Sequence, residues 1–351
     1  MKKITFQESL TLNSKLYIDC RSPAEYEIDH IPNSYNIPIL DNHERAIIGK
    51  IYKEKGSFEA KKKGVEIVSP KLKDLIDTLL NITENFKNII FYCARGGLRS
   101  TALANFFSLV SSKNILILNR GYKGYRNYIL TFFKHFDFKG KFLVVDGFTG
   151  SGKTLILKNL KEKGLPVIDL EDLAKHRGSV FGGVGIEKKP SQKKFETLLW
   201  YEMNKFKNKS IIIVEGESKN IGKISLPAKF YEKMNSSPHI WIETDDNLRV
   251  KIIKEDYLAN IKSYNELTEP VLYLKRFLGK KNVNMLVEEI KKENFDFVIM
   301  FLLKNYYDIL YKKHRLPEEK FYKKIYFTNI LEGTEKIEEI FYELKGDKWN
   351  H

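Results

Sequence analysis

The sequence predicts an α/β fold with two parallel-sheet domains, the second of which carries a largely helical C-terminal part. Short apolar runs alternate with helical patterns in two separate series, and such alternation is typical of parallel sheets. The first series closes near residue 134, and a new buried strand begins after Gly140. We therefore expect one domain over residues 1–134 and another over residues 140–351, with mostly helices after Asp245.

Length and composition narrow the class of protein. A chain of 351 residues with 42% hydrophobic side chains is long enough for two medium-sized domains with buried cores. It has two cysteines, no apolar segment behind its basic start and no run of about 18 apolar residues. We therefore expect a cytoplasmic enzyme that has no disulfide and no contact with a membrane. The net charge of +15 suits a polyanionic partner, but solvated lysines would give the same charge.

The elements of the first domain follow from hydrophobic spacing and from turn residues. The isoleucine spacing after His43 predicts a helix as far as Gly56, and we expect the basic segment that follows to end at Gly64. Pro70 is typical of the first turn of the next helix. The other expected elements are strands at residues 15–18, 89–92 and 114–118 and helices at residues 72–80 and 100–107.

A thiol stands at the end of a buried strand in this domain. The strand is followed by the loop Cys93-Ala94-Arg95-Gly96-Gly97-Leu98-Arg99-Ser100, which leads into a helix. The loop N–H groups and the helix N-terminus favour the thiolate of Cys93, a nucleophile. Arg95 and Arg99 make the loop receptive to an oxyanion. Taken alone, the loop would suit a small buried cysteine equally well.

Two upstream segments favour the nucleophile. They are Asp19-Cys20-Arg21-Ser22-Pro23-Ala24-Glu25-Tyr26 and Asp29-His30-Ile31-Pro32-Asn33-Ser34-Tyr35-Asn36-Ile37-Pro38, and together with the cysteine loop they resemble the rhodanese signature. Asp29 and Asn33 stand where that signature has glycine, and both residue types tolerate positive φ. Asp19 and Arg21 are candidate contacts for a substrate or for a polyanionic partner. We expect Cys20 to be a packing residue.

The second domain begins with a phosphate-binding motif. The strand at residues 142–146 runs into Gly147-Phe148-Thr149-Gly150-Ser151-Gly152-Lys153-Thr154, which is a complete G-x-x-x-x-G-K-[ST] loop followed by a helix. We expect Gly147, Gly150, Ser151 and Gly152 to bind phosphates through backbone N–H groups. Lys153 would reach the terminal phosphate, and Thr154 is a candidate ligand for Mg²⁺. No metal site follows from the motif alone.

Other polar residues of this domain are candidate contacts for a substrate or for a polyanionic partner. Glu215 and Glu217 follow a buried strand and take the place of the acid that commonly binds a metal beside such a loop, although an ordinary charged turn is an equal alternative. His176, Arg177 and Ser179 form a polar loop that could bind phosphate or a base edge. The aromatic stripe around residues 302–314 favours a core position over base stacking for each tyrosine.

The combination of these motifs, in this order, resembles the tRNA 2-selenouridine synthases. The resemblance rests on the cysteine loop, on Glu44-Arg45 with Gly49, on Gly147–Thr154, on His176-Arg177-Gly178-Ser179 with Phe181-Gly182, and on Tyr306-Tyr307-Asp308. Ile309 departs from the family, which has proline there.

The resemblance implies a specific reaction. Enzymes of this family replace sulfur by selenium in the 2-thiouridine at the wobble position of tRNAs for Lys, Glu and Gln, with selenophosphate as donor. They also attach a geranyl group from geranyl diphosphate to that sulfur, and the cysteine matching Cys93 is essential for selenation. The resemblance therefore implies tRNA as partner, with a selenophosphate-supplying enzyme as a further candidate, and no tightly bound cofactor.

Two other functions fit the same residues. A persulfide-type tRNA sulfurtransferase would use Cys93 to carry sulfur. A P-loop NTPase or kinase acting on RNA would use Lys153 to bind a nucleotide. We expect the phosphate loop to hold the diphosphate of geranyl diphosphate and the cysteine loop to act on selenophosphate.

Overall fold

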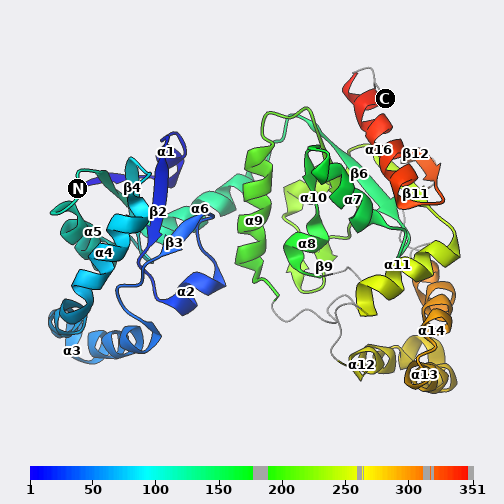
Figure 1. Cartoon of the computed structure of the whole chain (residues 1–351), viewed down its shortest axis with the longest axis horizontal. Coiled ribbons are helices and arrows are strands. Elements are labelled where there is room, and N and C mark those ends of the chain that lie inside the picture. The colour runs from blue at the N-terminus through cyan, green and yellow to red at the C-terminus, as the bar shows by residue number, and fades with distance from the viewer. Residues whose placement is uncertain (177–188, 259–262, 264, 311–316, 318–319, 347–351) are drawn as a thin grey trace. The chain divides into compact units, whose positions relative to one another are not determined.

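The computed structural model describes residues 1–176, 189–258, 263, 265–310, 317 and 320–346. The chain forms two compact units, which are coloured by residue number in Figure 1. Unit 1 comprises Met1–His135 together with Glu196–Trp200, and unit 2 comprises Phe136–Phe195 and Tyr201–His351. Both units are α/β structures with parallel sheets, as the sequence predicts.

Unit 1 contains a five-stranded parallel sheet with the order β1-β5-β4-β2-β3. The strands are β1 (Lys2–Ile4), β2 (Lys15–Asp19), β3 (Ser34–Asn36), β4 (Asn88–Tyr92) and β5 (Asn114–Leu118). The helices are α1 (Phe6–Leu10), α2 (Pro23–Ile28), α3 (Asn42–Val68), α4 (Leu72–Thr83), which follows a 3₁₀ turn at Ser69–Lys71, α5 (Leu98–Ser108) and α6 (Gly121–Lys134). Because β4 lies in the middle of the sheet, its carboxyl end is supported by strands on both sides.

Side chains alternate between the two faces of this sheet. Ile89 and Phe91 of β4 pack into a core with Leu103 and Phe107 of α5. On the other face, Tyr125 of α6 packs edge-on against Phe6 of α1. Both faces of the strand are therefore buried, which explains why its sequence is a continuous apolar run rather than an alternating one.

Helix α3 differs from the prediction. It runs to Val68, and Gly64, the expected end, lies inside it. The interruption is at Gly56, whose φ of 85° breaks the helix without ending it. A Cβ at Gly64 would be in ordinary contact with the Ile48 side chain, so this glycine needs no special backbone conformation. The basic residues before Gly64 thus marked an exposed face rather than a C-terminus.

Unit 2 contains a second parallel sheet, with the order β12-β11-β6-β8-β7. Its strands are β6 (Lys141–Gly147), β7 (Val167–Ile168), β8 (Ile211–Glu215), β11 (His239–Glu243) and β12 (Phe321–Tyr326), and β9 (Asn220–Ile221) pairs with β10 (Ile224–Ser225) in a separate ribbon. The helices associated with the sheet are α7 (Lys153–Glu162), α8 (Leu170–Ala174), α10 (Ala228–Asn235) and α16 (Ile330–Lys345). The helix α9 (Gln192–Lys205) has its two ends in unit 2 and its middle, Glu196–Trp200, in unit 1. Helices α7 and α16 pack on one face through Leu157 and Ile337.

The strand β12 was not predicted, because the sequence after Asp245 favours helices. Its residues are mostly exposed, and Lys323 and Lys324 lie within it. It forms one edge of the sheet and pairs only with β11 among the described strands. Lysines are common on edge strands, where they hinder pairing with other chains, and they hide the apolar alternation that identifies a strand.

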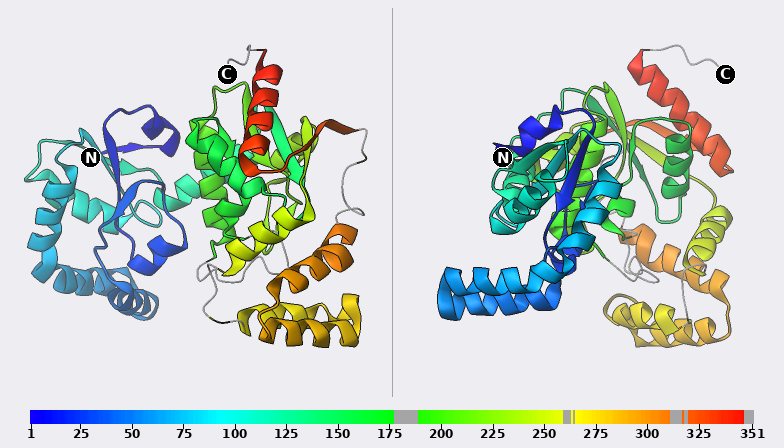
Figure 2. Two further views of the ribbon diagram at one scale, coloured as in Figure 1. Left: turned by 45° about the vertical axis from the view of Figure 1, so that its right-hand side comes forward. Right: turned by 60° about the vertical axis from the view of Figure 1, so that its left-hand side comes forward.

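The helical part of unit 2 has its own core. It consists of α11 (Asp246–Leu258), α12 (Asn265–Tyr273), α13 (Lys275–Lys291), α14 (Phe295–Leu302) and the π-helical turn η2 (Leu303–Tyr307). Both views in Figure 2 show α12, α13 and α14 grouped together. Tyr306 and Tyr307 are buried in this core, as the sequence favours, and Tyr306 packs edge-on against Phe277. Neither ring is therefore exposed for stacking on a base.

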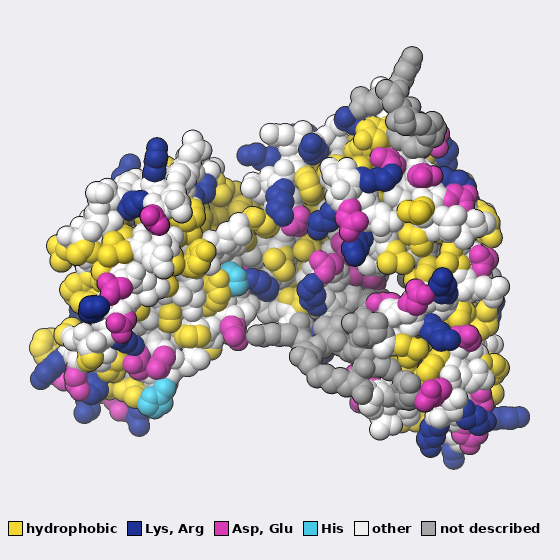
Figure 3. All heavy atoms as spheres, in the orientation of Figure 1, with side chains coloured by type: hydrophobic (Ala, Val, Ile, Leu, Met, Phe, Trp, Pro, Cys, Tyr) yellow, Lys and Arg dark blue, Asp and Glu magenta, His cyan; other side chains and the backbone are white. Residues whose placement is uncertain are grey.

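Within the described residues, every helix is too short or too polar to cross a membrane. On the face shown in Figure 3, Lys and Arg side chains are interspersed with Asp and Glu side chains. The net charge of +15 is therefore not gathered into a single patch on that face.

Candidate functional site

The thiol of Cys93 lies at the carboxyl end of β4, where the loop turns into α5. The Gly97 N–H and the Ser100 hydroxyl both donate to its Sγ, at 3.3 Å each. Gly97 is the N-cap of α5, so the positive end of the helix is directed at the sulfur. Both donors are thus directed at the sulfur from the loop and the helix that the sequence predicts to surround it. The Cys93 side chain is 4% exposed, beneath the exposed residues Gly97 and Leu98.

Two glycines allow the loop to take this shape. Gly96 has φ of 64°, and a Cβ there would lie 2.6 Å from the Leu118 carbonyl oxygen. Gly121 has φ of 53°, and its Cβ would lie 2.1 Å from the Cys93 carbonyl oxygen. The Tyr122 N–H donates to that same oxygen at 2.9 Å. The first turn of α6 therefore packs directly against the cysteine loop, and the contacts leave no room for a side chain at Gly96 or Gly121.

The two arginines of the loop have different environments. Arg99 forms a two-pronged contact with Glu25, with Nη1 2.6 Å from Oε2 and Nη2 3.4 Å from Oε1. Burial opposes the charged guanidinium, but Glu25 outweighs it and raises the pKa of Arg99. Arg95 is exposed, and the described residues contain no ion pair with it. Thus Arg95 is available to an oxyanion, whereas Arg99 already has a carboxylate partner, which its sequence neighbours did not reveal.

Asp19 and Arg21, predicted as substrate or tRNA contacts, are buried in the structure. Arg21 donates Nη2 to Asp19 Oδ2 at 2.6 Å and to the Asp29 carbonyl oxygen at 2.7 Å. Its guanidinium lies 4.1 Å from the centre of the Tyr122 ring. The two side chains are 0% and 3% exposed, so neither is open to a tRNA. Together they fix the segment after β2 to the first turn of α6, which packs against the cysteine loop.

We expect Asp19→Asn to lower the free energy of unfolding of unit 1 by about 3–5 kcal/mol, because the buried Arg21 would lose its charged partner. Urea unfolding followed by circular dichroism measures this loss. The matched control is Asp77→Asn, whose partner Lys73 is 84% exposed, and we expect it to cost less than about 1 kcal/mol. Equal losses in the two variants would contradict a structural role for the Asp19 carboxylate.

The two residues that replace glycine in the rhodanese signature differ from each other. Asn33 has φ of 61°, a conformation that asparagine tolerates. Asp29 has φ of −172°, which any residue can adopt, so its tolerance of positive φ is not used there. The Asp29 carboxylate has another task, because its Oδ2 accepts hydrogen bonds from Tyr122 at 2.8 Å and from Thr197 at 3.0 Å.

Cys20 lies beside the nucleophile loop but is fully buried. Its N–H donates to the Tyr92 carbonyl oxygen at 2.8 Å, and its side chain packs in the same core as Cys93. Burial raises the pKa of the Cys20 thiol well above its ordinary value, and the neighbouring Cys93 and Asp19 add to this effect. A buried neutral thiol agrees with the packing role that we expect for Cys20.

The phosphate loop of unit 2 connects β6 to α7. Gly150 and Gly152 have φ of 76° and 84°, and the Ser151 N–H donates to the Phe148 carbonyl oxygen at 3.1 Å. The Lys153 side chain is 9% exposed and donates to the carbonyl oxygens of Gly147 at 3.1 Å and Phe148 at 3.4 Å. The loop thus has the curled backbone that cradles phosphates, with the lysine across its base.

The polar side chains of the loop have contrasting positions. Ser151 Oγ is buried and has no hydrogen-bond partner among the described residues. Thr154 is exposed at the start of α7. Gly147 lies so close to its neighbours that a Cβ would be 2.6 Å from Ser151 Oγ and 2.9 Å from the Ile242 carbonyl oxygen. The loop therefore depends on its glycines for packing as well as for φ.

Three glutamates gather beside this loop. One carboxylate oxygen each of Glu171, Glu215 and Glu217 lies within 4.8 Å of the others, a spacing that could hold a metal ion. Glu215 is fully buried, its Oε2 accepts from the Glu171 N–H at 3.3 Å, and its Oε1 has no hydrogen-bond partner among the described residues. An oxygen-only donor set with a free buried oxygen suits Mg²⁺. The sequence pointed to Glu215 and Glu217 but not to Glu171.

The electrostatics of this cluster are unusual. Burial raises the pKa of Glu215 well above its ordinary value, and the negative charges of Glu171, Asp169 and Glu217 raise it further. Burial and Glu217 raise the pKa of Glu171 in the same way. The charge of Lys153 acts in the opposite direction on each of these glutamates. The cluster therefore holds protons or attracts a cation, and Lys153 lies within its field.

The polar loop after α8 is described only at its start. The His176 N–H donates to the Glu171 carbonyl oxygen at 3.1 Å, and the imidazole lies against Gly222, where a Cβ would be 2.7 Å from the ring. The backbone of His176 is thus hydrogen-bonded to Glu171, which is one of the three residues of the glutamate cluster. Arg177 and Ser179, the other two predicted contacts, lie outside the described residues.

Arg249 contacts the phosphate loop, and the sequence did not indicate it. It is 3% exposed, and its Nε donates to the Thr149 carbonyl oxygen in the phosphate loop at 3.1 Å. Its Nη2 and Nη1 contact Asp308 at 2.6 Å and 3.0 Å. Arg249 therefore joins the phosphate loop to the helical part of unit 2. The only signal was the Tyr306-Tyr307-Asp308 motif, which contains the partner of Arg249 but not Arg249 itself.

Family models match both units. Residues 6–128 match the rhodanese-like domain, and residues 140–330 match the AAA domain of tRNA 2-selenouridine synthase. A solved structure titled as the N-terminal domain of a putative ATP/GTP binding protein from Clostridium difficile 630 is 42% identical, covers 36% of this chain and 98% of its own, and has a TM-score of 0.35.

Several curated relatives are named tRNA 2-selenouridine synthase. The protein from Nitrosomonas eutropha is 37% identical over 246 residues, which are 69% of this chain and 63% of that protein. The protein from Bdellovibrio bacteriovorus is 36% identical over 74% of this chain and 67% of its own length. The protein from Sulfurovum sp. is 31% identical over 86% of this chain and 89% of its own length. The match thus spans less than two thirds of the first relative and most of the last. With its rhodanese-like unit, its phosphate loop and this similarity along both units, the chain belongs to the tRNA 2-selenouridine synthase family.

Proposed function

We propose that this chain is a transferase that replaces sulfur by selenium in the 2-thiouridine at the wobble position of tRNA. Selenophosphate is the selenium donor, tRNAs for Lys, Glu and Gln are the acceptors, and an S-geranyl intermediate is made from geranyl diphosphate. One observation carries this proposal. A single chain of this family has both a thiol that accepts from two donors and a phosphate loop whose glycines have positive φ.

The first step would take place at the phosphate loop. The sulfur of 2-thiouridine attacks C1 of geranyl diphosphate, the C1–O bond breaks, pyrophosphate leaves and the base loses its N3 proton. Pyrophosphate is a good leaving group only where its growing negative charge is stabilised. The loop N–H groups and Lys153, which lies across the base of the loop, supply that stabilisation.

The second step would take place at the cysteine loop. Selenium from selenophosphate replaces the geranylthio group at C2, geranylthiol leaves with one proton, and water takes the phosphoryl group as phosphate. Sulfur at C2 leaves readily only after alkylation, which is why the first step must come before the second. The Cys93 thiolate would attack the phosphorus of selenophosphate, so that the P–Se bond breaks and hydroselenide is released to attack C2. Water then cleaves the S–P bond, which releases phosphate and restores the thiol. The exposed Arg95 provides a cation for the selenophosphate oxygens.

A divalent cation would assist the first step. Its ligands would be Glu171, Glu215 and Glu217, whose oxygens converge beside Lys153. When bound, Mg²⁺ supplies positive charge for the oxygens of the diphosphate. The same cluster favours one rival function, a conventional NTPase, because a magnesium–nucleotide complex would fit the same residues.

We expect Glu215→Gln to stabilise unit 2 in EDTA. A carboxyl whose folded pKa is raised binds more protons when folded, so its contribution to stability is full below the ordinary value of 4.5 and is lost as pH rises through the raised pKa. Glutamine avoids that loss, and at pH 8 we expect the Tm to rise by roughly 2–4 °C. Differential scanning calorimetry measures the change, with Glu162→Gln, on the exposed end of α7, as the matched control.

The same experiment tests the cation. Mg²⁺ should raise the Tm of the unaltered protein and of Glu162→Gln, because it binds only the folded cluster. It should have little effect on Glu215→Gln. An equal effect of Mg²⁺ on all three proteins would contradict this site.

Mass analysis of the wobble nucleoside tests the reaction as a whole. A 2-thiouridine anticodon stem-loop is incubated with the protein and with geranyl diphosphate, selenophosphate or both. We expect the S-geranyl nucleoside with geranyl diphosphate alone and 2-selenouridine with both donors. Unchanged 2-thiouridine in every reaction would refute the proposal and favour a sulfurtransferase, which thiosulfate and cyanide would reveal, or an RNA-stimulated NTPase.

A further inference from the structure

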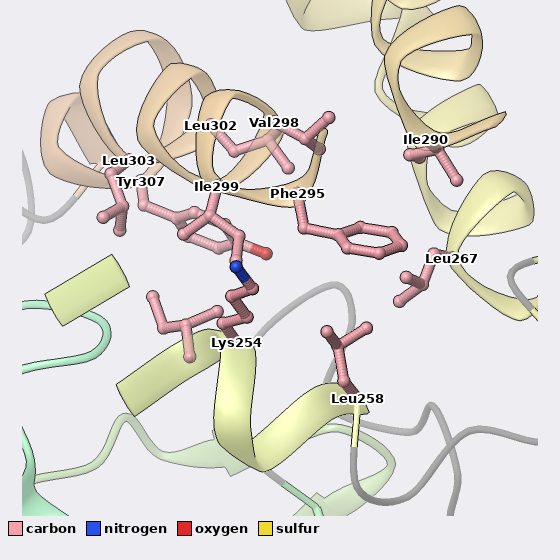
Figure 4. Close-up of a pocket in the computed structure, with 11 residues that line it drawn as sticks. Lys254, Leu258, Leu267, Ile290, Phe295, Val298, Ile299, Leu302, Leu303 and Tyr307 are labelled. Atoms are coloured by element: carbon pink, nitrogen blue, oxygen red, sulfur yellow. The ribbon is translucent and has the colours of Figure 1, made fainter. Parts of the chain in front are cut away.

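The helical part of unit 2 encloses an apolar pocket that none of the sites above uses. The pocket has about 560 Å³ of empty space, part of which is open to solvent. Figure 4 shows its walls, which are formed from four helices and the π-helical turn η2. Apolar side chains that include Leu258, Leu267, Ile290, Phe295, Val298 and Leu302 line it.

The pocket adjoins the phosphate loop through the side chain of Ile253. Ile253 of α11 lines the pocket, and the same side chain packs on Gly150, where a Cβ would lie 2.6 Å from Ile253 Cδ1. One turn earlier on α11, Arg249 donates to the Thr149 carbonyl oxygen. A single isoleucine therefore separates the phosphate loop from the apolar space, and α11 contributes to both.

The polar groups of the pocket are few. Lys254 and Tyr307 are the two lining residues with polar side-chain ends, and Figure 4 shows the Lys254 nitrogen directed toward the Tyr307 side of the space. Lys254 is 42% exposed and forms an ion pair with Asp296 at 2.8 Å. Tyr307 closes the π-helical turn, a feature that is frequent at functional sites. The rest of the wall offers only hydrocarbon.

We propose that this pocket holds the hydrocarbon chain of a prenyl diphosphate whose diphosphate occupies the phosphate loop. An anionic head and an apolar tail of about ten carbons match a phosphate loop that adjoins an apolar space. A nucleotide does not match it, because a base and a ribose would leave their polar groups without partners among Leu, Ile, Val and Phe side chains. The inference rests on the proposed function, since it assigns a place to the tail of the proposed geranyl donor.

The test fills the pocket and measures binding of three probes. Ile299 lines the pocket and is partly buried, so Ile299→Trp would occupy part of the space. By isothermal titration we expect the Kd for geranyl diphosphate to rise at least 10-fold. The Kd for inorganic pyrophosphate, which has no tail, should stay unchanged, and dimethylallyl diphosphate should show an intermediate effect. The matched control is Phe297→Trp on the same helix, because Phe297 is 42% exposed and does not line the pocket.

A second variant guards against a tryptophan that turns toward solvent. Val298 is 5% exposed, so Val298→Phe must place its ring in the pocket. Unchanged pyrophosphate binding shows that each variant has kept its phosphate loop. Geranyl diphosphate binding that equals the unaltered protein's in both variants would overturn the pocket assignment.

The outcome separates this inference from the proposed function. If the unaltered protein geranylates the stem-loop while both variants bind geranyl diphosphate normally, only the pocket assignment fails. If the unaltered protein forms no geranylated nucleoside, the proposed function fails. In that case the pocket assignment would still stand if the unaltered protein binds geranyl diphosphate more tightly than pyrophosphate and both variants lose this difference. Equal affinity of the unaltered protein for the two ligands would overturn the pocket assignment.

Discussion

Cys93→Ser abolishes selenation and leaves geranylation intact, if the two half-reactions are divided as proposed. Serine preserves the size of the side chain and can keep the contacts with the Gly97 N–H and the Ser100 hydroxyl. Its hydroxyl is a far weaker nucleophile than a thiolate, so we expect the rate of selenation to fall by at least about 10³-fold. The measurement is mass analysis of the wobble nucleoside, with selenophosphate and an S-geranyl stem-loop as substrates.

The matched control is the chain's other cysteine. Cys20→Ala removes a buried thiol from the same core, so it lowers stability by a modest amount but leaves the reacting sulfur in place. We expect normal selenation from this variant at a temperature at which it is folded. Selenation at the full rate by Cys93→Ser would contradict nucleophilic catalysis by Cys93. Loss of selenation in both variants would indicate that the core, rather than the thiol, is what matters.

Stability and chemistry are closely connected at this loop. The Cys93 carbonyl oxygen accepts from the Tyr122 N–H, and Gly121 packs against that oxygen too closely for a side chain. Arg21 stacks on Tyr122 and pairs with Asp19. The segment after β2 therefore positions the loop after β4 through the first turn of α6. Asp19 and Arg21 thus support the cysteine loop although they lie far from it in the sequence.

Much of the fold could be predicted from the sequence because most strands are buried on both faces. The apolar runs at residues 15–18, 89–92 and 114–118 correspond to β2, β4 and β5 with at most one residue of difference at either end. The edge strand β12 could not be found in this way, because it has two lysines and mostly exposed residues. Hydrophobic patterns report burial, so they fail where a strand has little of it.

The candidate site was predictable to the extent that its chemistry is local in sequence. The donors to Cys93 come from the seven residues after it, and the phosphate loop is one continuous segment. Glu171 and Arg249 were missed because each meets its partners only in the folded structure, across 44 and 100 residues of chain. The sequence showed that Asp29 stands where glycine is usual, but it did not show what the carboxylate binds. Its donors, Tyr122 and Thr197, lie far away in the sequence, so no local pattern predicts them.

Lys153→Ala is expected to abolish geranylation, and with it selenation of 2-thiouridine. Lys153 donates to two carbonyl oxygens of the loop and would turn to the diphosphate on binding, where it opposes the negative charge that develops on pyrophosphate. Loss of such a group costs about 10²–10³-fold in rate.

An S-geranyl stem-loop supplied to Lys153→Ala tests whether the defect is confined to the first step. We expect normal selenation of this substrate, because the cysteine loop is untouched and its leaving group is already in place. The matched control is Lys158→Ala on the exposed face of α7, where the lysine is 71% exposed and should be dispensable for both steps. Geranylation that persists in Lys153→Ala would remove the phosphate loop from the reaction. If the unaltered protein then binds ATP and hydrolyses it in response to RNA, and Lys153→Ala loses both activities, the loop would be assigned to a nucleotide instead.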